Sequence, residues 1–178
     1  MSKNAIIILV AGTIFIILFS WFVSIKEKRY HGIYRFFSFE SILLLVLLNY
    51  PIWFNDFFSV RQLFASLLLL LSVYLAFVGF YVLVKKGKPS QNFENTSRLV
   101  TTNIYKYIRH PLYASLLYFG LGAYLKNPTN PTVIILVLID IIGIILCSKE
   151  EEKEMTRKFG QEYREYMKNS KMFIPFVF

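Results

Sequence analysis

Five long apolar runs separate short polar segments along this chain of 178 residues, and they limit its possible folds more than any other feature. A helix rises about 1.5 Å per residue, so a hydrocarbon core about 30 Å thick requires roughly 20 apolar residues. We therefore predict an all-α integral membrane protein with about five transmembrane helices and a cytoplasmic C-terminal helical segment. The runs cover residues 5–25, 37–54, 62–84, 111–125 and 132–147, of which the last two are short.

Composition and charge exclude several other classes of protein. Apolar residues make up 56% of the chain, more than soluble domains contain. A net charge of +9 can indicate nucleic-acid binding, but here the basic residues stand between apolar runs, so we predict a membrane-surface partner and no nucleic acid. One cysteine and two histidines are too few for an intrachain disulfide or a Cys/His metal cluster, and we predict no metal.

Basic residues alternate between rich and poor connecting segments, and this pattern predicts the orientation. In chain order the segments outside the five runs carry one, four, one, six, one and seven Lys or Arg residues. Cytoplasmic segments retain positive charge, so we predict an N-terminus outside the cell membrane and a cytoplasmic C-terminus. We expect one membrane domain, residues 1–178, in which residues 1–98 form a three-helix part and residues 99–178 carry the functional motifs.

The first of these motifs, RHPLY at residues 109–113, stands at the predicted inner mouth of the fourth helix. Pro111 in the first helical turn costs no hydrogen bond and presets the entry angle of the chain. It holds Arg109 and His110 at the membrane boundary, with Tyr113 about one turn inside. An interfacial anchor, in which arginine reaches the headgroups and tyrosine joins the aromatic belt, is an alternative interpretation of the same residues.

A second motif, EEEKE at residues 150–154, directly follows the fifth run. Carboxylates beside an anionic leaflet are unfavourable unless a cationic group faces them, although a solvated helix start with Glu150 and Glu154 outward is an alternative. Because only KNPTNP joins the fourth and fifth runs, their inner ends should be neighbours, which places Arg109 and His110 beside the glutamates. Such a site can hold a small zwitterion.

Together the two motifs resemble those of the isoprenylcysteine carboxyl methyltransferases and, in much of the pattern, of the membrane phospholipid N-methyltransferases. The resemblance covers roughly residues 100–175, while the first three runs are similar only in character. It rests on RHPLY after a tyrosine-rich approach, the short hairpin, and then Glu151-Glu152, Met155, Phe159-Gly160, Glu162-Tyr163 and Tyr166.

The resemblance implies a small multi-pass enzyme that uses S-adenosylmethionine bound from the cytosol. It assigns Arg109 and Glu152 to the transfer centre, although the choice among the three consecutive glutamates 150–152 stays open. Asn103 and Ser115 stand where the family usually has glycine, and the closing KNSKMFIP lacks the usual Val-Pro-Arg. The residues that it assigns to the cofactor are Tyr107, His110, Tyr113, Glu151 and Glu152.

The methyl acceptor stays open at this stage. A carboxylate needs no strong general base, whereas an amine must first lose a proton, for which a glutamate or His110 would serve. We expect a lipophilic acceptor from the bilayer, foremost the carboxyl group of an isoprenylcysteine-like compound, with phosphatidylethanolamine as the alternative. A small transporter or channel subunit is disfavoured because only Glu40 and Asp140 lie within or near the runs, close enough to an end to be wetted. The oligomeric state also stays open.

Overall fold

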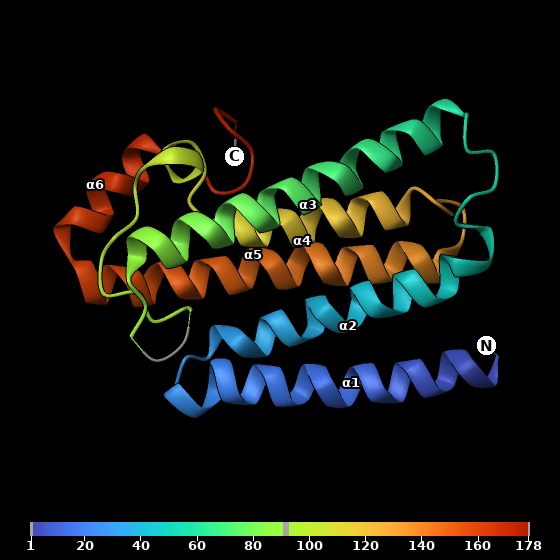
Figure 1. The fold of residues 1–178 in the computed structure, drawn as a ribbon, viewed down its shortest axis with the longest axis horizontal. Helices are drawn as coiled ribbons and strands as arrows, with labels where there is room; N and C mark the ends of the chain where they lie inside the picture. Colours follow the sequence, from blue (N-terminus) through green and yellow to red (C-terminus); the bar gives the residue numbers. More distant parts are fainter. Residues whose placement is uncertain (1, 91–92, 178) are drawn as a thin grey trace.

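The computed structural model describes residues 2–90 and 93–177, and every regular element in these ranges is helical. Figure 1 shows long helices running side by side, with a shorter helical segment and the C-terminal tail at one end. The α-helices are α1 (Lys3–Val23), α2 (His31–Asn49), α3 (Val60–Gly87), α4 (Pro111–Tyr124), α5 (Pro131–Phe159) and α6 (Gln161–Asn169). Short 3₁₀ helices occur at η1 (Ile25–Glu27), η2 (Tyr50–Ile52) and η3 (Asn103–Lys106).

Local sequence signals set several helix ends. Ser59 caps α3, because its side chain accepts a hydrogen bond from the Gln62 amide. Asn130 does the same for α5, and proline occupies the first turn of both α4 and α5. Gly160, with φ of +59°, ends α5 and lets the chain turn into α6.

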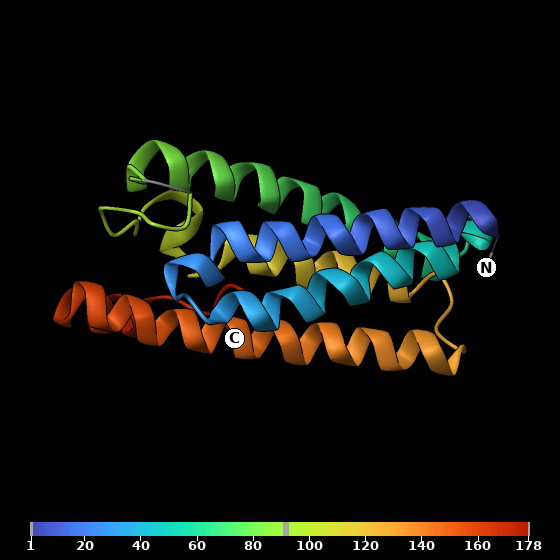
Figure 2. The ribbon, with the colours of Figure 1, turned by 90° about the horizontal axis from the view of Figure 1, so that it is seen from below.

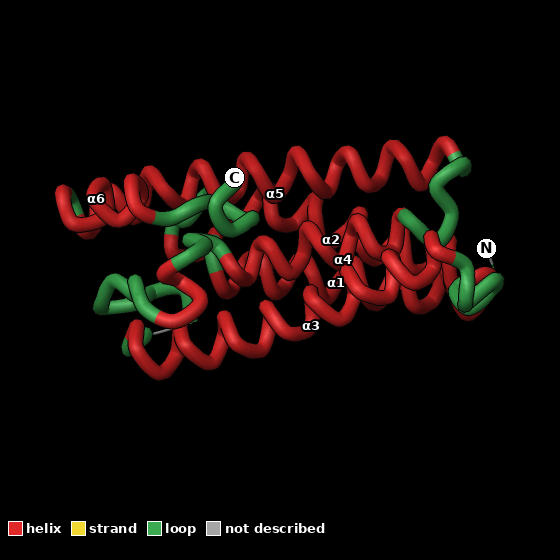
Figure 3. The backbone as a smooth tube through the Cα atoms, turned by 90° about the horizontal axis from the view of Figure 1, so that it is seen from above, coloured by secondary structure: helices red, strands yellow, loops and turns green. Residues whose placement is uncertain are grey.

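Helices from the two halves of the chain pack against each other. α2 packs on α5 and α3 packs on α4, so contacts cross the predicted division at residue 98, while α1 packs on α2 at the margin. Figures 2 and 3 show α3 and α5 on opposite sides of the bundle with α4 between them. The outward faces of α1 and α3 expose large apolar side chains such as Phe15 and Phe77, as expected of surfaces that face lipid.

Four described helical stretches are long and apolar enough to cross a membrane: residues 3–27, 31–52, 60–87 and 131–159. The fourth predicted run does form a helix, α4, but its 14 residues span only about 21 Å, less than the hydrocarbon thickness. Its first and last turns are largely buried among neighbouring helices. The protein is therefore an all-helical membrane protein, and the predicted count of five spans is not confirmed.

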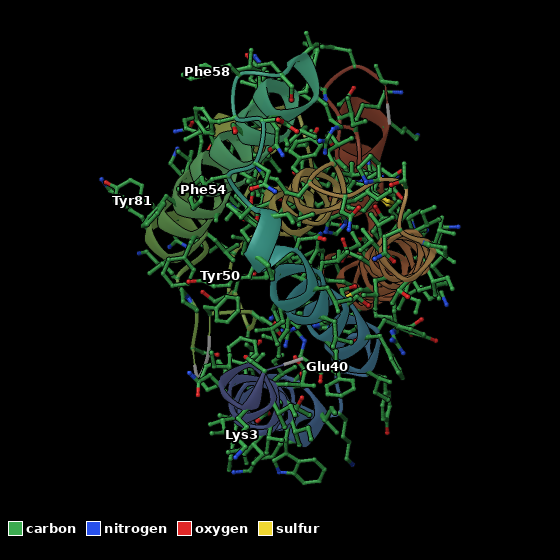
Figure 4. All side chains as sticks on the ribbon, turned by 90° about the vertical axis from the view of Figure 1, so that its right-hand side faces the viewer. Lys3, Glu40, Tyr50, Phe54, Phe58 and Tyr81 are labelled. Carbon is green, nitrogen blue, oxygen red and sulfur yellow. The ribbon has the colours of Figure 1, made fainter. Side chains whose placement is uncertain are left out.

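The two ends of the bundle differ. Figure 4 looks onto the end that holds the N-terminus, where Tyr50, Phe54 and Phe58 lie in short exposed segments, as an aromatic belt requires. At the opposite end α5 continues beyond α1 and α2 (Figure 1), and its segment 149–158 consists mostly of charged residues. That end holds the candidate site.

One expectation about intramembrane charge is wrong. Asp140 is fully buried rather than wetted, because its carboxyl group packs against Gly120 of α4, where a Cβ atom would clash with it. Its main-chain oxygen accepts a hydrogen bond from Ser38 of α2 at 3.2 Å. Glu40 of α2 is partly buried and accepts a hydrogen bond from Thr13 of α1. Figure 4 shows Glu40 on the side of α2 next to α1.

Candidate active site

The RHPLY motif enters α4 at a close contact with α3. A Cβ atom added to Gly79 would lie 3.2 Å from Cβ of Pro111, so a larger residue would press the start of α4 away from α3. The preceding 3₁₀ helix begins at Asn103 with φ of +62°, a conformation that asparagine tolerates better than most residues. This explains how asparagine replaces the glycine expected from the family pattern.

The C-terminal tail fixes the motif from the other side. The amides of Arg109 and His110 donate to the carbonyls of Lys171 and Met172 at 2.7 and 3.2 Å, and the Lys171 amide donates to the Tyr107 carbonyl at 3.0 Å. The ring of Phe173 is fully buried, and its centroid lies 6.3 Å from that of His110. The tail therefore packs into the site before its last residues become exposed.

The structure brings the two predicted motifs together. Arg109 Nε donates to Glu152 Oε1 at 2.8 Å, and His110 Nε2 lies 3.3 Å from the same oxygen. His110 Nδ1 lies 3.7 Å from Glu151 Oε2, so each ring nitrogen faces a carboxylate. We call these four residues, Arg109, His110, Glu151 and Glu152, the His110 cluster. Their contact confirms that the start of α4 and the charged end of α5 are neighbours, as the short hairpin predicts.

A cavity of about 250 Å³ opens beside the His110 cluster. Of the predicted site residues, it is lined by Arg109, His110, Tyr113 and Glu151. Glu152 is not among the described lining residues and lies behind Arg109 and His110. Tyr107, predicted to bind the cofactor, is 44% exposed and packs against Phe176 instead of lining the cavity.

Three tyrosines that sequence reasoning did not assign also line the cavity: Tyr105, Tyr163 and Tyr166. The Tyr166 hydroxyl donates to the Tyr105 carbonyl at 2.6 Å, and the Tyr105 hydroxyl donates to the Gly79 carbonyl at 3.3 Å. Burial raises the pKa of each phenol, and the nearby Glu151 carboxylate raises those of Tyr105 and Tyr163 further. The three phenols are therefore neutral at physiological pH.

A second charged group borders the same cavity. His31 lies with Nδ1 3.0 Å from Glu154 and Nε2 3.2 Å from Glu94, again between two carboxylates. Arg29 Nε donates to Glu154 at 3.0 Å, and Arg35 forms an ion pair with Glu94. We call these five residues the His31 cluster. Arg35 and Glu94 line the cavity.

The sequence contained a signal for this second cluster. α2 begins at His31, six residues before the predicted run, which places Arg35 inside the helix. Buried polar residues then recur along one face of α2 at helical spacing, a pattern that marks an interior face in an apolar helix: His31, Arg35, Ser38, Ser41 and Asn49. The alternative that placed Glu154 outward is wrong, since its side chain is only 14% exposed and pairs with Arg29 and His31.

The cavity combines groups that suit a cationic, partly aromatic ligand. Glu151 supplies a carboxylate, and tyrosine and phenylalanine rings supply faces that attract a cation. Glu151 lies about 30 Å along α5 from Pro131, so the charged end stands roughly one hydrocarbon thickness from the far end of the helix. The donor set therefore fits a sulfonium-bearing cofactor at the membrane boundary.

Comparison with known proteins gives partial matches. Methanethiol S-methyltransferase of Pseudomonas deceptionensis is 32% identical over 90 residues, which cover 49% of this chain and 32% of that protein. Probable protein-S-isoprenylcysteine O-methyltransferases of Oryza sativa subsp. indica and subsp. japonica are each 30% identical over 88 residues, 48% of this chain and 45% of theirs. The matched part is thus less than half the length of each relative.

A family model described as phospholipid methyltransferase matches residues 60–162, which is more than half of the chain. The match includes α3, α4 and α5 and all four residues of the His110 cluster. The chain belongs to the phospholipid methyltransferase family.

Proposed function

We propose that this protein is a membrane methyltransferase that uses S-adenosylmethionine and methylates a lipophilic acceptor, foremost the carboxyl group of an isoprenylcysteine-like compound. One observation carries the proposal: a single cavity joins the His110 cluster to a wall of apolar and aromatic side chains from α1, α2 and α3. A polar ligand and an apolar chain can therefore meet in one space. We place this cavity on the cytoplasmic side of the cell membrane, in line with the basic residues of the connecting segments.

The residues divide into two roles in this proposal. Glu151 and His110 bind the cationic and polar parts of the cofactor, with Tyr113 and the neutral phenols of Tyr105 and Tyr163 shaping its pocket. When bound, S-adenosylmethionine supplies an electrophilic methyl group carried on a sulfonium. A carboxylate and aromatic faces stabilise such a cation.

Arg109 and Glu152 form the centre assigned to transfer. Arg109 reaches the cavity, and its guanidinium also donates to the carbonyls of Met167 and Ser170, which holds the end of α6. Glu152 bonds both Arg109 and His110 from behind the cavity wall, so we assign it a positioning role. Alignment of acceptor and methyl group is the main contribution that such residues make to an in-line displacement.

An acidic acceptor suits the mostly apolar cavity. Transfer from a sulfonium to a carboxylate removes one positive and one negative charge, and a water-poor site favours this loss of charge. No group need accept a proton in that reaction. An amine acceptor, such as the headgroup of phosphatidylethanolamine, requires a base, and Glu151 is the candidate in the cavity. A thiol acceptor is a second candidate, favoured by the methanethiol S-methyltransferase relative.

The test is transfer from labelled S-adenosylmethionine by the full chain in lipid nanodiscs. The acceptors are a prenylcysteine analogue, phosphatidylethanolamine and a small alkyl thiol, supplied separately. We expect transfer to the prenylcysteine analogue to be fastest and Glu152→Ala to abolish it. Glu150→Gln is the matched control, because Glu150 pairs only with the exposed Lys153 in the described structure. Folded wild-type protein that methylates none of the three acceptors would contradict the proposal.

A further inference from the structure

The wall of the cavity away from the His110 cluster is aromatic. Phe19 of α1, Phe39 of α2, Phe80 of α3 and Phe93 of the following loop all line it. The ring of Phe19 lies 5.8 Å from that of Phe39 and 6.5 Å from that of Phe93, and the rings of Phe80 and Phe93 are 5.7 Å apart. These four rings form one continuous apolar surface, suited to a hydrocarbon chain.

Arg35 stands within this aromatic wall. Its guanidinium carbon lies 5.1 Å from the ring centroid of Phe19 and 5.8 Å from that of Phe39, and its side chain is 4% exposed. Nη2 donates to Ser24 Oγ at 2.8 Å, while Nε has no hydrogen-bond partner among the described residues. A nearly buried guanidinium that borders the cavity and keeps one buried donor without a described partner is costly for the fold alone, so it suggests a ligand.

Arg35 is not the only group that compensates the buried negative charge of Glu94. Its carboxylate also lies 3.6 Å from Arg29 Nη1 and 3.2 Å from His31 Nε2, and it accepts a hydrogen bond from Ser24 at 2.8 Å. Arg35 can therefore turn toward a ligand while Glu94 keeps two other basic neighbours.

Arg109, the other arginine of the cavity, is held differently. Its Nε donates to Glu152, and its Nη1 donates to the main-chain carbonyls of Met167 and Ser170. These bonds hold the Arg109 guanidinium between Glu152 and the residues that precede the C-terminal tail. Arg35 is the arginine that faces the aromatic wall.

We propose that Arg35 selects the acceptor, by binding an anionic oxygen of an amphiphile whose apolar chain lies along Phe19, Phe39, Phe80 and Phe93. The proposal rests on the proposed methyl transfer and adds the residue that recognises the acceptor. The shared chemistry is an anionic oxygen next to a hydrocarbon chain, which a prenylated carboxylate and a phospholipid both offer. A neutral thiol has no anionic oxygen, so Arg35 should favour these two acceptors over a thiol.

The experiment compares an acid with its neutral counterpart on the full chain in nanodiscs. N-acetyl-S-farnesylcysteine is the methylated acceptor, its carboxamide is a competitor, and phosphatidylethanolamine forms a separate arm. For Arg35→Gln we expect KM for the acid to rise at least about tenfold, with an unchanged inhibition constant for the amide. A rise in KM for phosphatidylethanolamine instead assigns the subsite to a phosphate.

Arg29→Gln is the matched control, because it removes a cation from the same cluster at a residue outside the described cavity lining. It should leave the preference for acid over amide unchanged. Arg35→Lys retains the charge and should keep part of the preference, which guards against a fold defect in Arg35→Gln. S-adenosylmethionine affinity, measured in every variant, should stay within about twofold of wild type.

Two results would overturn the assignment of Arg35. One is an Arg35→Gln enzyme that keeps the wild-type preference for acid over amide in the presence of normal cofactor binding. The other is an equal loss of affinity for acid and amide, which would make Arg35 structural. Wild-type protein that binds no S-adenosylmethionine would instead refute the proposed function, so the two failures are distinguishable.

Discussion

The His110 cluster and the His31 cluster use the same arrangement in two places. In each, both ring nitrogens of a histidine face glutamates. Arginine pairs with one of these glutamates in the His110 cluster and with both in the His31 cluster. The His110 cluster comes from two short motifs on α4 and α5. The His31 cluster draws residues from the α1–α2 connection, α2, the loop after α3, and α5.

The first cluster can therefore be recognised from sequence motifs, whereas the second is formed only by the packing of distant segments. Residues 109–110 and 151–152 are recognisable because each pair is contiguous and a short hairpin joins them. Glu94 and Arg35 have 58 residues between them and no common motif, and they meet because α2 packs on α5 while the loop after α3 covers both. We infer that the first cluster binds the cofactor. In the second, Arg35 recognises the acceptor, while Arg29, His31 and Glu154 brace the bundle.

Arg109→Ala should have the largest effect and is the strongest test of the division of roles. The variant loses the bond to Glu152 and the bonds to the tail carbonyls, so both His110 and the tail lose their positions. We expect methyl transfer to fall about 100-fold or more, because small displacements at a reacting centre are this costly. Protease cleavage of the tail should also become faster.

Arg164→Ala is the control for this variant, since Arg164 lies on the exposed face of α6. It should preserve transfer and tail protection. Wild-type activity in Arg109→Ala would show that the His110 cluster does not organise the reaction.

Glu154→Gln should moderately lower the stability of the fold. It removes the carboxylate shared by Arg29 and His31, which joins α5 to the α1–α2 connection. We expect the free energy of unfolding, measured by denaturant titration in mixed micelles, to drop by about 1–3 kcal/mol. Affinity for S-adenosylmethionine should change little, and a large loss of that affinity would merge the two clusters into one functional unit.

Substitution of Asn103 should give the smallest effect. Asn103→Gly keeps the left-handed backbone at the entry to the His110 cluster and should leave stability within about 0.5 kcal/mol of wild type. Asn103→Ala should destabilise by about 1 kcal/mol, because a Cβ atom without a compensating polar group is strained there. Equal stability of the alanine and glycine variants, in the same titration, would contradict this explanation of the family departure.

Much of the architecture could be predicted from sequence, because the length of an apolar run and the position of a proline are local signals. The runs became helices, Pro111 opened α4, and the hairpin placed Arg109 beside Glu152. How deeply a helix lies in the membrane, and which of its side chains are buried, could not be predicted in the same way. Whether α4 crosses the membrane, and whether Asp140 is wetted, depends on how neighbouring helices pack.

The candidate site follows the same rule. Arg109, His110, Tyr113 and Glu151 lie at the cavity because motif spacing constrains them. Tyr107 points elsewhere, because the tail pairs with its main chain and Phe176 packs on its ring.

We propose above all that the His110 cluster binds S-adenosylmethionine. Isothermal titration of the purified full chain in nanodiscs tests it most directly, with His110→Ala as the site variant and Glu150→Gln as the control. We expect saturable, micromolar binding to wild type and to Glu150→Gln, and its loss in a folded His110→Ala protein. Equal binding by His110→Ala and wild type, or no binding by wild type, would contradict it.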